Sequence, residues 1–100
     1  MPTPITSAQK RYLRGLAHAL KPVVLVGGKG ITDGLVAETV EALGIHELIK
    51  VKVAAEDRDA RDLAIGTLVE AAQAALVARI GNIAVLYRPR ADKPLIALPR

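Results

Sequence analysis

A short glycine-rich segment carries the strongest chemical signal in this sequence. It reads Gly27-Gly28-Lys29-Gly30 and directly follows the apolar run Val23–Val26, which is typical of a buried strand. An amphipathic segment with the pattern of a helix comes next, and Thr32 or Asp33 can cap it. Glycines between a strand and a helix leave backbone N–H groups free near the positive end of the helix dipole. With the cation of Lys29, this arrangement predicts an anion site, and phosphate is the anion we expect.

The glycine segment alone does not identify a known nucleotide-binding motif. A P-loop places Ser or Thr after the lysine of a longer glycine-bounded loop, whereas Gly30 follows Lys29 here. The three-glycine spacing of dinucleotide-binding domains is also missing from the segment. A tight turn that needs a positive φ would explain the glycines equally well. The surrounding charges must therefore decide between a structural turn and a phosphate site.

The composition predicts one small domain over residues 1–100. The chain has 51% hydrophobic residues, only 2% aromatic residues and no cysteine. The lack of cysteine excludes disulfides, thiolate metal sites and a cysteine nucleophile. We find no secretion signal and no apolar run long enough to cross a bilayer, so we expect a cytoplasmic protein without a membrane partner.

Charge is distributed unevenly along the chain. The formal net charge is +4, but residues 1–30 have five basic and no acidic side chains, and residues 31–70 carry a net charge of −5. Residues 71–100 return to a net charge of +4. This pattern predicts one surface that faces a polyanion and one acidic surface that faces solvent. The shortage of aromatic rings disfavours base stacking, so for a nucleic acid we expect recognition of the backbone rather than of the bases.

The first thirty residues also predict a helix with two different faces. Thr6 or Ser7 can cap a helix that runs to about His18, before Pro22 prevents its continuation. Apolar residues recur on one side at helical spacing: Leu13, Leu16, Ala17 and Leu20. Basic residues follow on another side: Lys10, Arg14 and His18, with Arg11 beside them. We expect the first face to enter the core and the second to contact the polyanion.

The remaining pattern predicts the element order α-β-α-β-α-β-β. The second helix should bury Leu35, Val36, Thr39, Val40 and Leu43 and end at Gly44, and Leu48–Val53 should form a strand. A third helix should start at Asp57 or Asp59 and bury Leu63, Leu68, Val69 and Ala72. Strands at about Leu76–Ile80 and Ile83–Arg88 should form a hairpin across Gly81-Asn82. The expected fold class is α/β, a two-layer domain with a mixed four-stranded sheet.

Several runs of this sequence resemble the CRM domain, named for chloroplast RNA splicing and ribosome maturation. They are Leu13–His18, Lys21–Gly27, Gly30–Thr32, His46–Val53 and Val85–Pro89. The match spans nearly the whole chain and is closest to stand-alone bacterial YhbY-like RNA-binding proteins. The resemblance implies a fold similar to the C-terminal domain of translation initiation factor three. It also implies RNA binding, association with precursors of the large ribosomal subunit, and a GxxG loop at Gly27–Gly30 like that of KH domains.

These observations together predict a non-enzymatic, monomeric RNA-binding protein whose partner is ribosomal RNA in the precursor large subunit. The candidate RNA-binding residues are Lys10, Arg11, Arg14, Lys21, Gly27, Gly28, Lys29, Gly30, Arg88 and Arg90. No cofactor, catalytic residue or metal site is expected, since His18 and His46 lack ligand-type neighbours and the acids at 56–62 fit helix capping better. The alternatives are a general RNA chaperone, a module that binds a small phosphate ligand, and an adaptor that uses the acidic helices.

The sequence allows more than one interpretation of two features. Lys50 and Lys52 could contact RNA, or they could keep a sheet face soluble or protect a sheet edge. The tail Pro94–Arg100 contains the apolar run Leu95–Leu98 between prolines. This run is compatible with pairing on a sheet edge and with lying along the surface.

Overall fold

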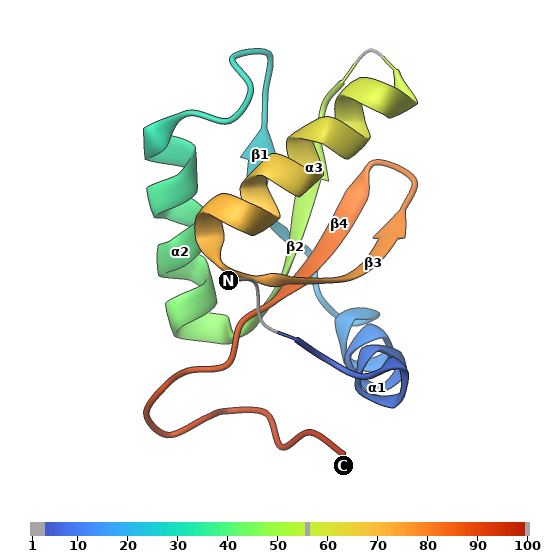
Figure 1. Cartoon of the computed structure of the whole chain (residues 1–100), viewed down its shortest axis with the longest axis vertical. Coiled ribbons are helices and arrows are strands. Elements are labelled where there is room, and N and C mark those ends of the chain that lie inside the picture. Colours follow the sequence, from blue (N-terminus) through green and yellow to red (C-terminus); the bar gives the residue numbers. More distant parts are fainter. Residues whose placement is uncertain (1–3, 56, 100) are drawn as a thin grey trace.

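The computed structural model of the chain describes residues 4–55 and 57–99, and its elements follow the expected order (Figure 1). Glu56 and Arg100, which belong to the predicted acidic cluster and tail, lie outside the described residues. The elements are α1 (Ser7–Ala17), β1 (Pro22–Val26), α2 (Asp33–His46), β2 (Leu48–Val53), α3 (Arg58–Ala72), β3 (Ala75–Ile80) and β4 (Ile83–Tyr87). Thr6, Thr32 and Asp57 cap the three helices, each accepting a hydrogen bond from a backbone N–H of the first turn.

The four strands form one mixed sheet in the order β1-β2-β4-β3. Strand β2 is parallel to β1 and antiparallel to β4, and β3 pairs with β4 across the Gly81-Asn82 turn. The expected fold class, a mixed four-stranded sheet with three helices, is therefore confirmed. Successive side chains of each strand point to opposite faces of the sheet, and both faces carry buried residues.

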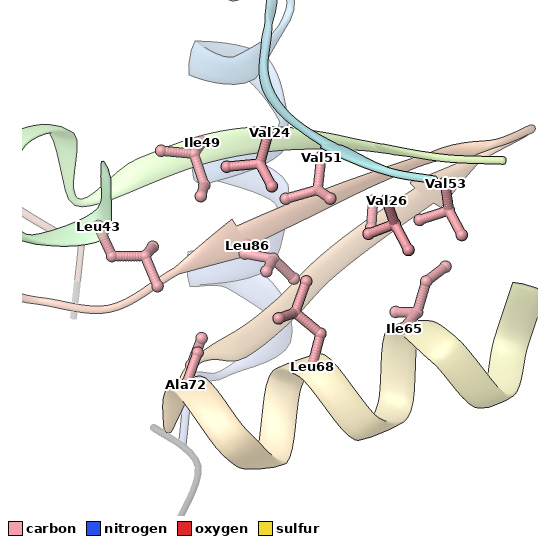
Figure 2. Packing of buried hydrophobic residues seen from close by; sticks show 12 residues of the cluster. Val24, Val26, Leu43, Ile49, Val51, Val53, Ile65, Leu68, Ala72 and Leu86 are labelled. Carbon is pink, nitrogen blue, oxygen red and sulfur yellow. The ribbon is translucent and has the colours of Figure 1, made fainter. Parts of the chain in front are cut away.

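The larger core lies between the sheet and the helices α2 and α3. Val51 and Val53 of β2, Leu86 of β4, and Ile65 and Leu68 of α3 point into it (Figure 2). Every member is aliphatic, in keeping with the 2% aromatic content of the sequence. Since aliphatic side chains recur at every second strand position and every three to four helix positions, the pattern in the sequence predicts most members of this core.

A smaller core on the opposite face of the sheet holds α1. Leu13 and Ala17 of α1 pack there against Leu48, Val85 and Tyr87 of the sheet. The predicted two-layer packing thus describes the part of the sheet under α2 and α3, and α1 adds a partial third layer. Two other members of the predicted α1 stripe, Leu16 and Leu20, remain partly exposed, because the helix covers only one end of this face.

The prediction that Val23–Val26 forms a buried strand holds for only one face of the strand. Strand β1 lies at an edge of the sheet, and its side chains alternate. Val24 and Val26 are buried under α2, whereas Val23 is 48% exposed and Leu25 is 60% exposed. No helix covers their side of the strand, because α1 packs at the other end of that face.

Three predictions for the helices also need correction. Val40, which the pattern places in the buried stripe of α2, is 36% exposed. Helix α2 continues past Gly44 to His46, because Glu47 rather than Gly44 takes the positive φ, 62°, that ends the helix. In α3, Leu63 is 73% exposed, and Ile65 occupies the buried stripe with Leu68 and Ala72 instead. A stripe through Ile65 keeps the spacing of three and four residues that a helix on a sheet requires.

A buried carboxylate fixes the path of the tail. Glu47 is fully buried, and its two oxygens accept hydrogen bonds from the backbone N–H groups of Arg90 (2.6 Å), Leu95 (2.7 Å) and Ile96 (2.8 Å). The described part of the tail lies along the surface and does not pair with a sheet edge, and Ile96 and Leu98 pack beside the α1 core. Burial, and then the nearby Glu47 carboxylate, raises the pKa of Tyr87 above its ordinary value of 10.0.

We predict that Glu47→Gln destabilises the domain by about 2 kcal/mol, because an amide nitrogen would face a backbone N–H donor and leave it unsatisfied in a buried place. Chemical denaturation measures the loss, and hydrogen exchange at Arg90, Leu95 and Ile96 should accelerate. Glu41→Gln, an exposed change on the same helix, is the matched control and should remain within about 0.5 kcal/mol of the parent. Equal stability of the two variants would contradict the structural role of Glu47.

Candidate nucleic-acid interface

The glycine segment forms a tight turn between β1 and α2. The backbone N–H of Gly30 donates to the carbonyl of Gly27 at 3.1 Å, and Gly30 takes a positive φ of 73°. Gly28 and Lys29 are exposed at the tip, and among the described residues their N–H groups have no hydrogen-bond partner. A methyl group added at Gly27, Gly28 or Gly30 would meet no other atom within 4 Å. The tip is therefore accessible for close approach of a ligand to the backbone.

The start of α2 does not lie at the glycine turn, so its helix dipole contributes less to an anion site there than the sequence predicts. Helix α2 begins three residues after the glycine turn, and the Thr32 hydroxyl already accepts the N–H of Leu35 at 3.1 Å. The carboxylate of Asp33 also lies in the first turn. A capped helix start with its own negative charge offers little to a second anion. The chemistry available at the turn is the two tip amides and the ammonium of Lys29.

The two main groups of candidate residues lie at opposite ends of the sheet. The glycine turn follows the carboxyl end of β1, whereas α1, with Lys10, Arg11 and Arg14, packs near the start of that strand (Figure 1). Lys21 is exposed at the start of β1. Lys21 therefore lies near the end of α1. The length of strand β1 separates Lys21 and the basic residues of α1 from Lys29.

The tail and the basic residues occupy different flanks of α1. Gln9 donates from its side-chain nitrogen to the carbonyl of Pro99 at 3.0 Å, and Leu16 lines a groove with Ile96 of the tail. Lys10 and Arg14 lie on the other side of the buried residue Leu13 by helical geometry. The tail thus leaves the basic flank of α1 open to a partner.

The two arginines after β4 have different surroundings. Arg88 is half-buried, and its guanidinium donates to the carbonyl of Ala72 at the end of α3 (3.3 Å). This bond satisfies an otherwise open helix terminus, which gives Arg88 a structural role. Arg90 is exposed, and its backbone is held by Glu47. Its side chain is therefore presented from a fixed position.

Charge that alternates along the sequence is sorted onto two faces of the sheet in space. On the α1 side, the exposed or half-buried charged residues of α1, β1 and β2 are all basic: Lys10, Arg11, Arg14, Lys21, Lys50 and Lys52. Most exposed acids lie on α2 and α3 or at their caps, on the other side: Asp33, Glu38, Glu41, Asp57, Asp59, Asp62 and Glu70. The tail adds Asp92, and α3 also carries Arg58 and Arg61, so the acidic side is negative in net charge but not free of bases. Arg79 pairs there with Asp62 at 3.0 Å. The α1 side therefore has the electrostatic character of a polyanion-binding surface.

Other kinds of site have little support in the described residues. Within residues 4–55 and 57–99, no three His, Cys, Asp or Glu side chains are arranged to hold a metal ion. A groove of about 480 Å³ lies between α1, the start of β1 and the tail, and it includes His46 and mostly aliphatic residues. It contains no residue of the glycine turn. No helix in the described parts of the chain is both long and apolar enough to cross a bilayer.

A small α/β domain with one basic side and an exposed glycine turn is the kind of protein that binds polyanions through their backbone. Comparison with known protein families identifies the family of this domain. The family model of the CRS1 / YhbY (CRM) domain matches residues 5–88, and the chain belongs to this family. The resemblance drawn from the sequence is therefore confirmed.

The relatives of the chain are named for RNA binding. An RNA-binding protein of Haemophilus influenzae is 51% identical over 98 residues, which cover 98% of each chain. The protein of Bacillus subtilis named "Probable RNA-binding protein YqeI" is 38% identical and covers 95% of this chain and 99% of its own. A solution structure of a candidate RNA-binding protein of Staphylococcus aureus matches with a TM-score of 0.83 and 38% identity, over 96% of this chain and all of that one.

We predict that Gly30→Ala costs about 1 kcal/mol of stability, because alanine pays a steric penalty at the positive φ of this position. Gly28→Ala is the matched control, since Gly28 has no positive φ and its Cβ would meet open space. Thermal unfolding of the two variants measures the difference. Equal losses would show that the turn does not depend on the conformation of Gly30.

Proposed function

We propose that this protein is a non-enzymatic RNA-binding protein that acts on the RNA of the precursor large ribosomal subunit and assists its assembly. The observation that carries the proposal is the separation of charge onto the two sides of the sheet, with basic residues alone on α1, β1 and β2. RNA is the polyanion suggested by the names of the relatives. The precursor subunit comes from the family resemblance. In this proposal the protein works as a monomer in the cytoplasm and needs no cofactor.

The proposed contacts divide into two groups. At the glycine turn, the tip amides of Gly28 and Lys29 and the ammonium of Lys29 would contact one phosphate, with Gly27 and Gly30 shaping the turn. On the α1 side, Lys10, Arg11, Arg14 and Lys21 would contact neighbouring phosphates. Arg90 lines a groove beside Val40 and Gly44 of α2, so its cation would be added from outside the α1 side. Arg88 is the candidate least able to contact RNA, because its guanidinium already donates a hydrogen bond to the carbonyl of Ala72. Contacts of this type position an RNA backbone without reading its sequence.

We predict that Gly28→Asp combined with Lys29→Asp severely weakens RNA binding, since two carboxylates would stand where a phosphate is expected. The fold should persist, because Gly28 has no positive φ and both positions are exposed. Filter binding to large-subunit ribosomal RNA over a salt series measures the effect. Lys29→Ala alone should lower the salt slope by about one unit. Full affinity in a folded double variant would exclude the turn as a contact.

The basic flank of α1 makes a separate prediction. Lys10→Glu with Arg14→Glu should weaken RNA binding without a change in melting temperature beyond a few degrees, because both side chains are exposed and lie off the buried stripe. Binding assays and thermal unfolding test the two halves of this statement. If the folded double variant binds as tightly as the parent, α1 is a solvated face.

Sedimentation tests the biological part of the proposal. The native protein should travel with precursor large subunits and be lost from mature ones, and the salt-dependent component should dominate its affinity for RNA. Tight mononucleotide binding with a flat salt slope would instead favour a small phosphate ligand. Equal binding to unrelated RNAs together with no association with precursor subunits would favour a general RNA chaperone.

A further inference from the structure

Part of the sheet face on the α1 side is left uncovered. Val23 and Leu25 of β1, Lys50 and Lys52 of β2, and Ile80 and Ile83 of the hairpin make up this area, which we call the open sheet face. They share one side of the sheet with Leu48 and Val85, which contact α1. Leu25 is 60% exposed and Ile80 is 45% exposed, so α1 does not reach them.

The open sheet face includes a row that crosses all four strands. Leu25 pairs with Lys52, Lys52 pairs with Ile83, and Ile83 pairs with Ile80. Directly paired residues point to the same face of a sheet, so the row is continuous. It lies two residues before the glycine turn on β1 and next to the Gly81-Asn82 turn. The row therefore lies at the same end of the molecule as Lys29.

The two lysines at the centre of this face form no ion pair with a described acidic residue. Lys52 is exposed, and it forms no ion pair with any residue of 4–55 and 57–99. The ammonium of Lys50 donates to the carbonyl of Leu20 at 3.0 Å, which places it beside the connection from α1 to β1. Among the described residues, the exposed acids of α2 and α3 lie on the opposite side of the sheet, and Asp92 lies in the tail. The described charged side chains on this apolar area, Lys50 and Lys52, are therefore both basic.

We propose that the open sheet face binds an unpaired RNA segment that continues from the glycine turn toward α1. Lys52 and Lys50 would contact phosphates, while the exposed aliphatic side chains would pack against riboses and base faces. This inference rests on the proposed function and extends it, because it joins two groups of candidate contacts that otherwise lie a strand length apart. An acidic protein segment would also suit the charge, but the continuity with the glycine turn and the α1 bases favours RNA.

Because the face contains no aromatic ring, base contacts there should be tolerant of sequence. An unpaired strand can expose its bases to a flat surface, whereas a duplex keeps them stacked inside. The proposal therefore expects the open sheet face to distinguish single strands from duplexes. The glycine turn and α1, which contact phosphates, should make no such distinction.

The test compares two pairs of matched variants in the full chain. Lys52→Glu and Arg58→Glu change the net charge equally, but Arg58 is exposed on α3, on the other side of the sheet. Leu25→Gln and Leu63→Gln are the same change at two exposed leucines on opposite sides. The probes are a short oligouridylate and a hairpin RNA with the same number of phosphates. Thermal unfolding confirms that each variant remains folded.

We expect Lys52→Glu to weaken oligouridylate binding about tenfold and Arg58→Glu by no more than about twofold, because only the first removes a phosphate contact. Leu25→Gln should weaken oligouridylate more than hairpin binding, and Leu63→Gln should alter neither. In the parent, methyl resonances of Leu25, Ile80 and Ile83 should shift when oligouridylate is added.

The outcomes separate this inference from the proposed function. If Lys52→Glu matches Arg58→Glu and the methyl resonances do not move, while the Gly28→Asp, Lys29→Asp variant still loses affinity, the open sheet face is not an RNA site and the proposed function stands. If the parent binds neither RNA, the proposed function fails and the inference fails with it. If the methyl resonances respond only to an acidic peptide, the face belongs to a protein partner and the inference is overturned.

Discussion

The buried carboxylate of Glu47 organises the half of the molecule that carries α1. Its three hydrogen bonds to backbone N–H groups tie the end of α2, the exit from β4 and the tail into one unit. A carboxylate that accepts several N–H bonds is a strong acceptor, and its desolvation is offset only while all three donors stay in place. The tail positioned in this way brings Ile96 and Leu98 against the α1 core. The small core on this face therefore depends on one charged side chain rather than on apolar area alone.

The placement of α1 also decides the electrostatics of the domain. If α1 shared a face with α2 and α3, its bases would mix with their acids and the field would largely cancel. Because α1 packs on the other face, the sheet separates the two charges. A polyanion would meet one side of the molecule with attraction and the other with repulsion. This separation orients the domain on RNA before any specific contact forms, under the proposed function.

The incomplete cover that α1 gives to the sheet has a consequence for the glycine turn. A turn with two free amides and one lysine is a small site, and its capped neighbour helix adds little. The open sheet face begins at its base and carries Lys52 and Lys50 toward Lys21 at the end of α1. Physical continuity between these groups would let many weak phosphate contacts act together, which is how backbone-directed binding reaches useful affinity.

Local patterns in the sequence were enough to predict the element order, two candidate residues for each helix cap, the hairpin turn and most of the aliphatic core, because caps, turns and periodicity act over a few residues. They also predicted the family and the basic character of α1. They failed where a residue's role depends on distant partners. Nothing near Glu47 in the chain indicates that its carboxylate will meet Arg90, Leu95 and Ile96, and nothing near Leu25 indicates that its face of β1 will lack a cover. The sequence by itself determined which segments are helices and strands and which carry charge. Only the tertiary structure decided which face of the sheet each helix covers, because that choice depends on packing between residues far apart in the chain.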